Sequence, residues 1–353
     1  MSTAIAADPE HAALNELSAA LGRDPRRTQA AGGNTSLKRD GVMWIKASGT
    51  WLADATARDI MVPVLLEPML RAFEEGDIRA EKAVDFVDRA ANSSGLRPSI
   101  ETSVHAVMRQ PVVVHIHCVE TIALAVRSDG EARIRERLLP LRDVRLAYVP
   151  YRRPGLPLAA AIVEAMTPET NVVIFGNHGL LVAGESVAEV ADRVERVCTA
   201  LAAPARSSAE PDTDRLGAIA AGSGYRLPTL SEAHAVALDP ISQSIVEQGS
   251  LYPDHVIFLG PGVVKGTVLE GRLLELLDAE GKPPRMLLLS GQGVLLHRDC
   301  DKGADAMARC LADVVARIPE GAPVLTLSPE QDYELTHWEA EQYRQALNRG
   351  TRP

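Results

Sequence analysis

The sequence predicts an α/β fold with two domains, the second smaller than the first. Short apolar runs such as residues 112–114 and 172–175 are rich in β-branched side chains, as buried strands are. They alternate with stretches of helical periodicity, of which residues 187–201 are the clearest, with apolar side chains along one stripe. A chain of 353 residues is long enough for two domains and a substantial core.

Elements are expected along the chain from the same signals. Amphipathic patterns predict helices over residues 9–21 and 119–126, and the long stretch 54–91 is also expected to be largely helical. Residues 255–259 are apolar and precede a GPG turn, so we expect a strand there. Ser328 has the features of an N-cap and predicts a final helix that packs on the domain or forms a subunit contact.

The best domain boundary is a Pro/Ser/Ala-rich stretch, AAPARSSAEPDTD, that begins at Ala202 and has little apolar content. We therefore expect a first domain over residues 1–203 and a linker over residues 204–227. Residues 228–353 then form a C-terminal α/β domain.

An internal similarity relates the two parts. The segment that starts at Asn171 can be aligned without gaps with the segment that starts at Arg285. Both follow the order apolar strand, small-residue turn, apolar strand, acidic turn and helix. In that alignment Gln292 takes the place of His178, and an amide binds metal poorly. The C-terminal domain could thus be a degenerate repeat without metal, or a generic α/β unit of the same length.

Composition limits the partners. With 37 basic and 47 acidic residues the net charge is −10, which argues against nucleic acid, because phosphate backbones require a basic surface. No run reaches the roughly 20 apolar residues that span a bilayer, and no signal peptide is evident, so we expect no membrane association and a cytoplasmic protein. Four cysteines without CxxC spacing fit a reducing compartment and argue against a cysteine-based structural zinc site.

The stretch from Arg97 to Cys118 carries the strongest chemical signal. In an extended strand alternate side chains share a face, so His115 and His117 point the same way. Their Cα atoms would lie roughly 6.5 Å apart, which allows both imidazoles to bind one ion. His178, between Gly176 and Gly179, is a third candidate ligand. Three imidazoles with one open position are typical of catalytic zinc, whereas the alternative is a set of buried, hydrogen-bonded histidines.

Glu101 is the candidate acid–base residue. We place it in the first turn of a helix capped by Ser99, where the helix dipole favours a carboxylate. It could be an ordinary solvated residue, but near a metal it could move a proton at a carbon next to a polarised carbonyl. His105 shares its helix face, and we expect it to pack beneath the site instead of serving as a fourth ligand.

Two loops could bind an anion. The loop with Gly32 and Gly33 leads into Asn34 and is rich in backbone and side-chain donors, although a plain turn between strands is the alternative. The predicted strand from Val42 ends at Lys46, which adds a positive charge just before a Ser-Gly turn.

Five motifs in order, GGNTS, KASG, RPSIE, HIH and NHG, resemble the class II aldolase/adducin family over about residues 10–200. The KASG and PSIET motifs are most similar in sequence to those in the aldolase part of rhamnulose-1-phosphate aldolase/dehydrogenase fusions. The resemblance implies a three-layer α/β/α domain over residues 1–203. It implies Zn²⁺, or another divalent metal, on His115, His117 and His178, with Glu101 catalytic. The residues that it implies for substrate or phosphate binding, with Lys46 as an added cation, are Asn34, Lys46, Ser48, Gly49 and Ser99.

The function that this resemblance implies is a zinc-dependent aldolase. Such an enzyme would cleave or form a carbon–carbon bond in a short ketose, with a ketose 1-phosphate as the expected substrate, through a metal-stabilised enediolate. The alternatives are a sugar-phosphate epimerase or dehydratase and, if no metal binds, an adducin-like scaffold. The family also implies a homo-oligomer with sites near subunit borders.

The sequence departs from the family pattern at two points. Ser99 is followed by Ile100 where family members carry paired serines, so a carboxylate or an unphosphorylated sugar remains an alternative to a phosphate. No tyrosine matches the one that handles the proton on the aldehyde oxygen, and Tyr148 and Tyr151 are the nearest. We favour the interpretation that both are aromatic residues that plug a strand end, so the acid that acts on the aldehyde oxygen is not assigned.

Overall fold

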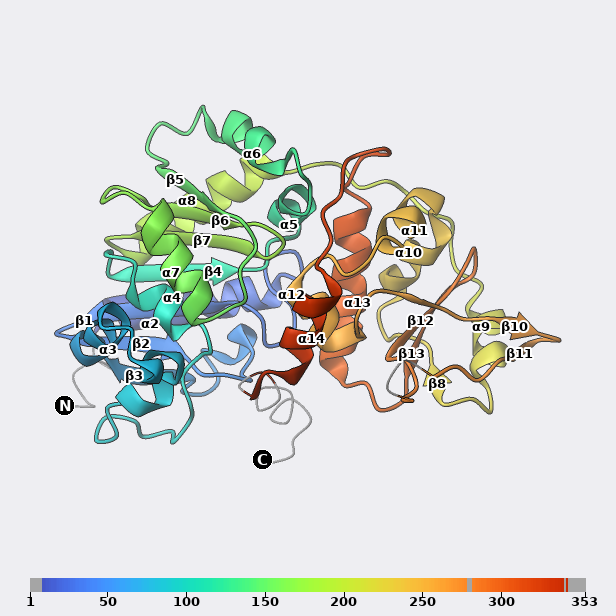
Figure 1. Ribbon diagram of the computed structural model, residues 1–353, viewed down its shortest axis with the longest axis horizontal. Helices are drawn as coiled ribbons and strands as arrows, with labels where there is room; N and C mark the ends of the chain where they lie inside the picture. Colours follow the sequence, from blue (N-terminus) through green and yellow to red (C-terminus); the bar gives the residue numbers. More distant parts are fainter. Residues whose placement is uncertain (1–7, 278–280, 340, 342–353) are drawn as a thin grey trace.

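The computed structural model describes residues 8–277, 281–339 and 341 and has the predicted α/β architecture (Figure 1). Its first half contains a seven-stranded sheet in the order β3-β2-β1-β4-β7-β6-β5. Those strands are β1 (Asn34–Arg39), β2 (Val42–Lys46), β3 (Met61–Leu65), β4 (Val112–Ile116), β5 (Leu146–Val149), β6 (Val172–Phe175) and β7 (Gly179–Gly184).

Helices cover both faces of this sheet. They are α2 (Pro9–Arg23), α3 (Leu66–Glu74), α4 (Thr102–Ala106), α5 (Val119–Ala125), α6 (Gly130–Leu138), α7 (Leu156–Ala165) and α8 (Val187–Leu201), with 3₁₀ turns η1 (Leu52–Asp54), η2 (Ile78–Glu81) and η3 (Ala83–Phe86). Helices α2, α5, α6 and α8 pack with one face, and α4 and α7 with the other. The domain is therefore the three-layer α/β/α arrangement that we expected.

Strand β4 shows the alternation that the sequence analysis assumed. Val112, Val114 and Ile116 pack in the cluster with α2, α5 and α8, whereas Val113 packs with α4 and α7. His115 is in phase with Val113, so it faces the side of the sheet on which α4 lies. The strand pairs with β1 and β7 on its two sides and is buried along its whole length.

The second half builds a smaller sheet, β8-β13-β12-β9, and a separate β10-β11 hairpin. Its strands are β8 (Tyr225–Arg226), β9 (Val264–Lys265), β10 (Val268–Leu269), β11 (Arg272–Leu273), β12 (Met286–Leu289) and β13 (Gly293–His297). Its helices are α9 (Thr213–Ala220), η4 (Ser231–His234), α10 (Ala235–Leu238), α11 (Pro240–Val246), α12 (Pro253–Leu259), α13 (Lys302–Val315) and α14 (Pro329–His337). The predicted final helix thus starts as expected, and the tail beyond Glu341 lies outside the described residues.

Three local expectations were wrong. Residues 61–65 form β3, an edge strand that pairs with β2 and tolerates Pro63, and helix α3 starts only after it. Residues 255–259 belong to helix α12, because Pro253 at its first position favours a helix start and a short apolar run does not discriminate helix from strand. Helix α4 begins after Glu101, which occupies the N-cap position assigned to Ser99.

The connection between the halves is shorter than expected. Residues 202–212 have no regular structure, but α9 and β8 follow within the predicted linker of residues 204–227. Leu216 on α9 packs with Leu287 of β12, and β8 pairs with β13. The latter part of that segment therefore belongs structurally to the second half.

The two sheets share one pairing pattern. Phe175 pairs with Gly179 between β6 and β7, and Leu289 pairs with Gly293 between β12 and β13, as the ungapped sequence alignment requires. In each sheet the first of these strands has a parallel neighbour, β5 or β9, and the second has an antiparallel one, β4 or β8. The internal similarity thus extends to topology and register.

A common hydrophobic core joins the halves. Val119, Ile122 and Val126 of the α5 segment lie in one buried cluster with Val256 of α12 and Leu311 of α13. Helices α5 and α13 lie side by side, which Figure 1 shows at the centre of the molecule. The second half therefore packs directly against the helix that follows β4 and its two histidines.

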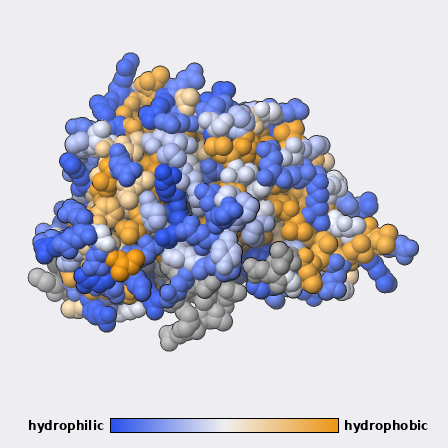
Figure 2. Space-filling view, in the orientation of Figure 1, coloured by the Kyte–Doolittle hydropathy of each residue, from blue (hydrophilic) through white to orange (hydrophobic). Residues whose placement is uncertain are grey.

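The surface in Figure 2 is mostly hydrophilic, with apolar side chains in separate areas, one of them toward the end formed by β10 and β11. Leu269 and Leu277 are exposed in that region. Among the helices of the described residues, none has both the length and the apolar character needed to cross a bilayer.

The second half contains an ion pair between a buried carboxylate and a half-buried guanidinium, and its loss should destabilise the protein. Asp305 on α13 binds Arg226 of β8 through two contacts of 2.8 and 3.0 Å and accepts the Thr229 amide. Burial alone would raise the Asp305 pKa, but Arg226 and the amide outweigh it and hold the pKa below its usual 3.8. Asp305→Asn should lower the free energy of unfolding by about 2–3 kcal/mol at pH 7, as measured by urea denaturation.

A lowered folded-state pKa gives this effect a definite pH dependence. The stabilisation is complete above the unfolded pKa and is lost as pH falls through the folded one. The difference between wild type and Asp305→Asn should therefore shrink between pH 5 and about pH 3. An equal difference at both pH values would contradict the assignment.

Candidate metal centre

Four side chains that the sequence analysis singled out meet at the end of strand β4. Glu101, His115, His117 and His178 each offer one ligand atom, and these atoms all lie within 4.8 Å of one another. Glu101 precedes α4, the two neighbouring histidines come from the end of β4, and His178 lies in the β6-β7 turn. All four are at most 5% exposed, so the cluster is buried.

The orientation of the two β4 histidines suits a cation. The Nδ1 of His115 donates to the Leu180 carbonyl at 3.0 Å, and the Nδ1 of His117 lies 2.9 Å from Oδ2 of Asp254. The Leu180 carbonyl holds a proton on Nδ1 of His115, and the negative charge beside Nδ1 of His117 favours a proton there too, so that each Nε2 presents a lone pair. The two Nε2 atoms are 3.2 Å apart, whereas nitrogens at 2.0–2.1 Å from a tetrahedral ion are about 3.3 Å apart.

Glu101 completes the cluster with a carboxylate. Its Oε2 accepts from Asn34 Nδ2 at 2.9 Å and lies 3.5 Å from Nε2 of His115. Its Oε1 is buried without a hydrogen-bond partner, 3.5 Å from Nε2 of His178. An unpartnered carboxylate oxygen beside imidazole nitrogens is a further feature that a cation would satisfy.

The electrostatics give the protonation states that metal binding requires. Burial alone would raise the pKa of Glu101, but the surrounding histidines and the Asn34 hydrogen bond lower it to about 2. Burial lowers the pKa of His178 to about 3, against the opposing effect of the Glu101 carboxylate, and lowers that of His115 as well. An ionised carboxylate and neutral imidazoles are the forms that bind a metal.

The turn that carries His178 is held by the second half of the chain. Asn177 has a left-handed φ of 53°, and its Nδ2 donates to the carbonyls of Leu251 and Leu325 at 2.9 and 2.8 Å. A Cβ on Gly179 would lie 2.6 Å from the Ile116 carbonyl, so only glycine lets the turn approach β4 this closely.

Sequence reasoning missed Asp254, which contacts His117 from helix α12. It is 4% exposed and lies in LYPDHVIFL, a stretch in which it is the only acidic residue. A carboxylate in an apolar stretch is rarely buried unless it is paired, and this was the available signal. The signal did not identify the partner, because no local spacing connects Asp254 with the β4 histidines.

The residues expected to bind substrate lie in the loops around Glu101. Asn34 donates to Ser99 Oγ at 3.1 Å as well as to Glu101, and Ser99 Oγ accepts the Glu101 amide. The backbone of Ser48 bonds to the Arg97 carbonyl, which joins the two loops. Lys46 is buried and donates to the Ala31 carbonyl at 2.8 Å, whereas Ser48 Oγ is buried without a hydrogen-bond partner. Gly49 adopts a positive φ of 72° in the turn that follows.

Other candidate side chains lie outside the cluster. His105 is buried, with Nδ1 2.7 Å from Ser36 Oγ, and so packs beneath the site. The hydroxyl of Tyr148 lies beside Gly176, 3.1 Å from the position that a Cβ would take there. The Tyr151 hydroxyl is buried without a hydrogen-bond partner, and burial raises the pKa of both phenols.

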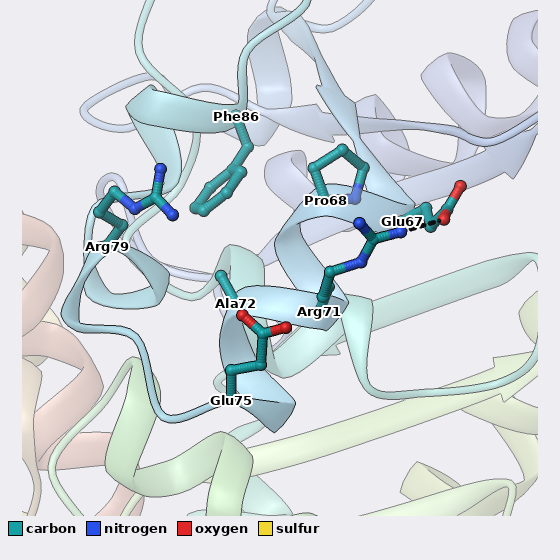
Figure 3. A pocket seen from close by; sticks show the side chains of 7 residues that line it. All are labelled: Glu67, Pro68, Arg71, Ala72, Glu75, Arg79 and Phe86. Carbon is teal, nitrogen blue, oxygen red and sulfur yellow. Dashed lines mark hydrogen bonds and ion pairs between the residues drawn. The ribbon is translucent and has the colours of Figure 1, made fainter.

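A separate pocket of about 310 Å³ lies between α3 and the η2–η3 segment (Figure 3). Its two guanidinium groups are paired, Arg71 with Glu67 and Arg79 with Asp77, each at 2.6 Å. Phe86 lines its other side. The pocket shares no residue with the Glu101 cluster.

Residues 13–203 match the family model of the class II aldolase and adducin N-terminal domain. The chain belongs to this family. The matched segment contains the seven-stranded sheet and the four clustered side chains, and it ends shortly after α8. The second half lies outside it.

Two curated relatives resemble the same part of the chain. The Bacillus subtilis protein named "Uncharacterized oxidoreductase YuxG" is 32% identical over 180 residues, which are 47% of this chain and 25% of that protein. The 3-oxo-tetronate 4-phosphate decarboxylase of Escherichia coli strain K12 is 29% identical over 113 residues, 30% of this chain and 53% of that protein. The chain thus matches only a part of each relative's length.

Among solved structures, the N-terminal class II aldolase domain of a Thermoplasma acidophilum protein is 24% identical, with a TM-score of 0.47. The similarity covers 55% of this chain and 92% of that one. An L-fuculose-1-phosphate aldolase from Thermus thermophilus is 18% identical with a TM-score of 0.37, over 54% of this chain and 89% of that one.

Gly32 provides a test of the geometry around His117. A Cβ at this position would lie 2.7 Å from both His117 Nδ1 and Asp254 Oδ2. Gly32→Ala should therefore displace one of these groups and weaken divalent metal binding by about tenfold or more, measured by competition with a chromophoric chelator. Gly217→Ala is the matched control, because nothing lies within 4 Å of its Cβ position. Equal affinities in the two variants would contradict the proposed orientation of His117.

Proposed function

We propose that this chain is a metal-dependent aldehyde-lyase of the class II aldolase type. It would cleave or form a carbon–carbon bond in a short ketose, with a ketose 1-phosphate as the expected substrate. The observation that carries the proposal is the convergence of His115 and His117 Nε2, 3.2 Å apart, beside His178 and an ionised Glu101, with the Leu180 carbonyl and the Asp254 carboxylate behind the two Nδ1 atoms. Buried lone pairs that face one another at 3.2 Å repel unless a cation lies between them.

The residues proposed to hold the metal are His115, His117 and His178, with Glu101 beside them. We propose zinc, because neutral imidazoles and an open position are its common catalytic environment, and another divalent ion could take its place. When bound, the ion would act as a Lewis acid toward the negative charge that develops on the substrate oxygens during bond cleavage.

Glu101 is the proposed acid–base residue. Its Oε1 has no hydrogen-bond partner and could remove or return a proton at the substrate carbon next to the carbonyl. Asn34 donates to Oε2 of the same carboxylate and to the Ser99 hydroxyl, which in turn accepts the backbone amide of Glu101. Oε2 is thereby restrained, whereas Oε1 is available to the substrate.

The substrate's anionic group is proposed to bind at the two loops beside Glu101. Ser48 Oγ is buried without a protein partner, and Gly49 turns the backbone directly after it. The Ser99 hydroxyl and Asn34 lie next to these loops. Lys46, whose Nζ donates to the Ala31 carbonyl, adds a positive charge. A hydroxyl donor and a nearby cation suit a phosphate or a carboxylate.

A decarboxylase is the second candidate, because a relative that matches this part of the chain is named as one. Loss of CO₂ next to a carbonyl also leaves negative charge that a cation would stabilise, so the same residues serve both reactions. An epimerase or dehydratase is a further alternative on the same scaffold. Assays for released aldehyde and released CO₂ from ketose phosphates and 3-oxo acid phosphates separate these reactions.

The wider organisation is also a proposal. We propose a catalytic domain over residues 1–203 and a second domain that is a degenerate repeat without metal. The matching strand register supports this, and so does the shared turn, in which His178 bonds to Phe175 and Gln292 bonds to Leu289. We also propose a homo-oligomer, which light scattering would test, and a reducing cytoplasm, which fits the four free cysteines.

Metal content is the first test. Purified protein should contain about one divalent ion per chain by elemental analysis, and His117→Ala should lose it, because two imidazoles hold a catalytic ion weakly. A native circular dichroism spectrum of the variant excludes unfolding as the cause. Absence of stoichiometric metal from wild type, even after incubation with zinc, would favour an adducin-like scaffold instead.

Glu101→Gln separates catalysis from metal binding. The amide keeps the shape of the side chain but cannot accept the substrate proton, so kcat should fall about 10²–10⁴-fold. The three histidines remain, so metal content should stay near that of wild type. Wild-type turnover in this variant would remove Glu101 from the mechanism.

A further inference from the structure

The side chain of Asp254 connects the second half of the chain to the candidate metal centre. Its Oδ2 lies 2.9 Å from Nδ1 of His117, and its side chain is 4% exposed. Asp254 lies in the first turn of α12, outside the segment that matches the family model. The histidine on the catalytic sheet is thus contacted by a buried carboxylate from another part of the fold.

Asp254 differs from the groups behind the other two histidines. The Nδ1 of His115 faces a backbone carbonyl, and the Nδ1 of His178 is buried without a hydrogen-bond partner among the described residues. A carboxylate acceptor fixes the tautomer of an imidazole and raises the basicity of its other nitrogen, which strengthens a metal bond. Of the three histidines, His117 is therefore the one whose Nδ1 faces a carboxylate.

Charge balance gives a second reason for a carboxylate at this position. With neutral imidazoles, Glu101 alone would place one negative charge beside a divalent ion in a buried site. Asp254 supplies the second, so the site and its ion together become neutral. Burying a net charge is costly, and a neutral set of groups reduces that cost.

The position of Asp254 is itself well supported. Leu251 donates its amide to His255 Nδ1 at 3.3 Å, and His255 Nε2 bonds to the Gly262 carbonyl at 3.0 Å. The Leu251 carbonyl accepts from Asn177, next to His178. The segment that carries Asp254 is therefore anchored both within the second half and on the β6-β7 turn.

We infer that Asp254 is a positioning residue of the metal centre: it holds His117 with Nε2 toward the ion, so that the second half of the chain completes the site. This inference rests on the metal site proposed above. It assigns to the second half a direct role in metal affinity beyond packing.

The test compares Asp254→Asn with wild type in the full-length protein, using zinc and a competing chelator for affinity and cobalt for the absorption spectrum. Metal affinity should fall about 10–100-fold, because the amide cannot act as a carboxylate toward His117 Nδ1. The cobalt absorption bands should shift, since they report the geometry and strength of the ligands. Asp254→Glu, which restores the charge, should recover part of the affinity.

Asp305→Asn is the matched control, because it removes a buried carboxylate of the second half that pairs with Arg226, away from the cluster. It should lose stability and keep wild-type affinity and cobalt spectrum. A comparable loss of affinity in this control would mean that general loosening of the second half is responsible, and would overturn the inference. So would equal affinities and spectra of wild type and Asp254→Asn.

Wild-type protein provides a measurement that does not depend on a variant folding. In the metal-loaded protein, ¹⁵N spectra of labelled histidine should show His117 protonated at Nδ1 and metal-bound at Nε2, and metal on Nδ1 would refute the positioning role. Failure of wild type to bind any metal would instead refute the proposed function, so the two failures are distinguishable.

Discussion

The fold around the cluster depends on polar groups placed behind three of its four candidate ligands. An imidazole or carboxylate removed from water must have partners, or the protein loses stability. His115 finds a carbonyl on the neighbouring strand, Glu101 finds an asparagine on β1, and His117 finds Asp254. These partners turn the remaining nitrogens and oxygens inward. The same contacts that make the cluster stable also give it a shape suited to a cation.

Much of this arrangement could be predicted from sequence because it depends on local periodicity. The alternation of side chains along β4 placed His115 and His117 together, and the glycines around His178 indicated a close turn. Residues 112–116 are also apolar on both faces, as a strand between two helical layers must be. These features involve neighbours within a few residues, for which spacing is a reliable guide.

The parts that could not be predicted depend on tertiary contacts. Asp254 reaches His117 because α12 packs on α13, which packs on α5, and no spacing in the sequence records these contacts. Residues 255–259 and 61–65 were assigned to the wrong element, since short apolar runs fit helix and strand equally well. In both places a proline was the decisive signal: Pro253 starts a helix, and Pro63 is accepted at a sheet edge.

The shared core between α5 and the C-terminal helices also bears on how such chains should be divided. Similarity to the family ends at residue 203, and a boundary drawn there looks natural in sequence. A shortened chain that stops at that boundary would expose the apolar side of α5 and leave the Asn177 amide without its two carbonyl acceptors. The unit of inheritance that sequence similarity recognises is therefore shorter than the length of polypeptide needed to hold the His178 turn in place.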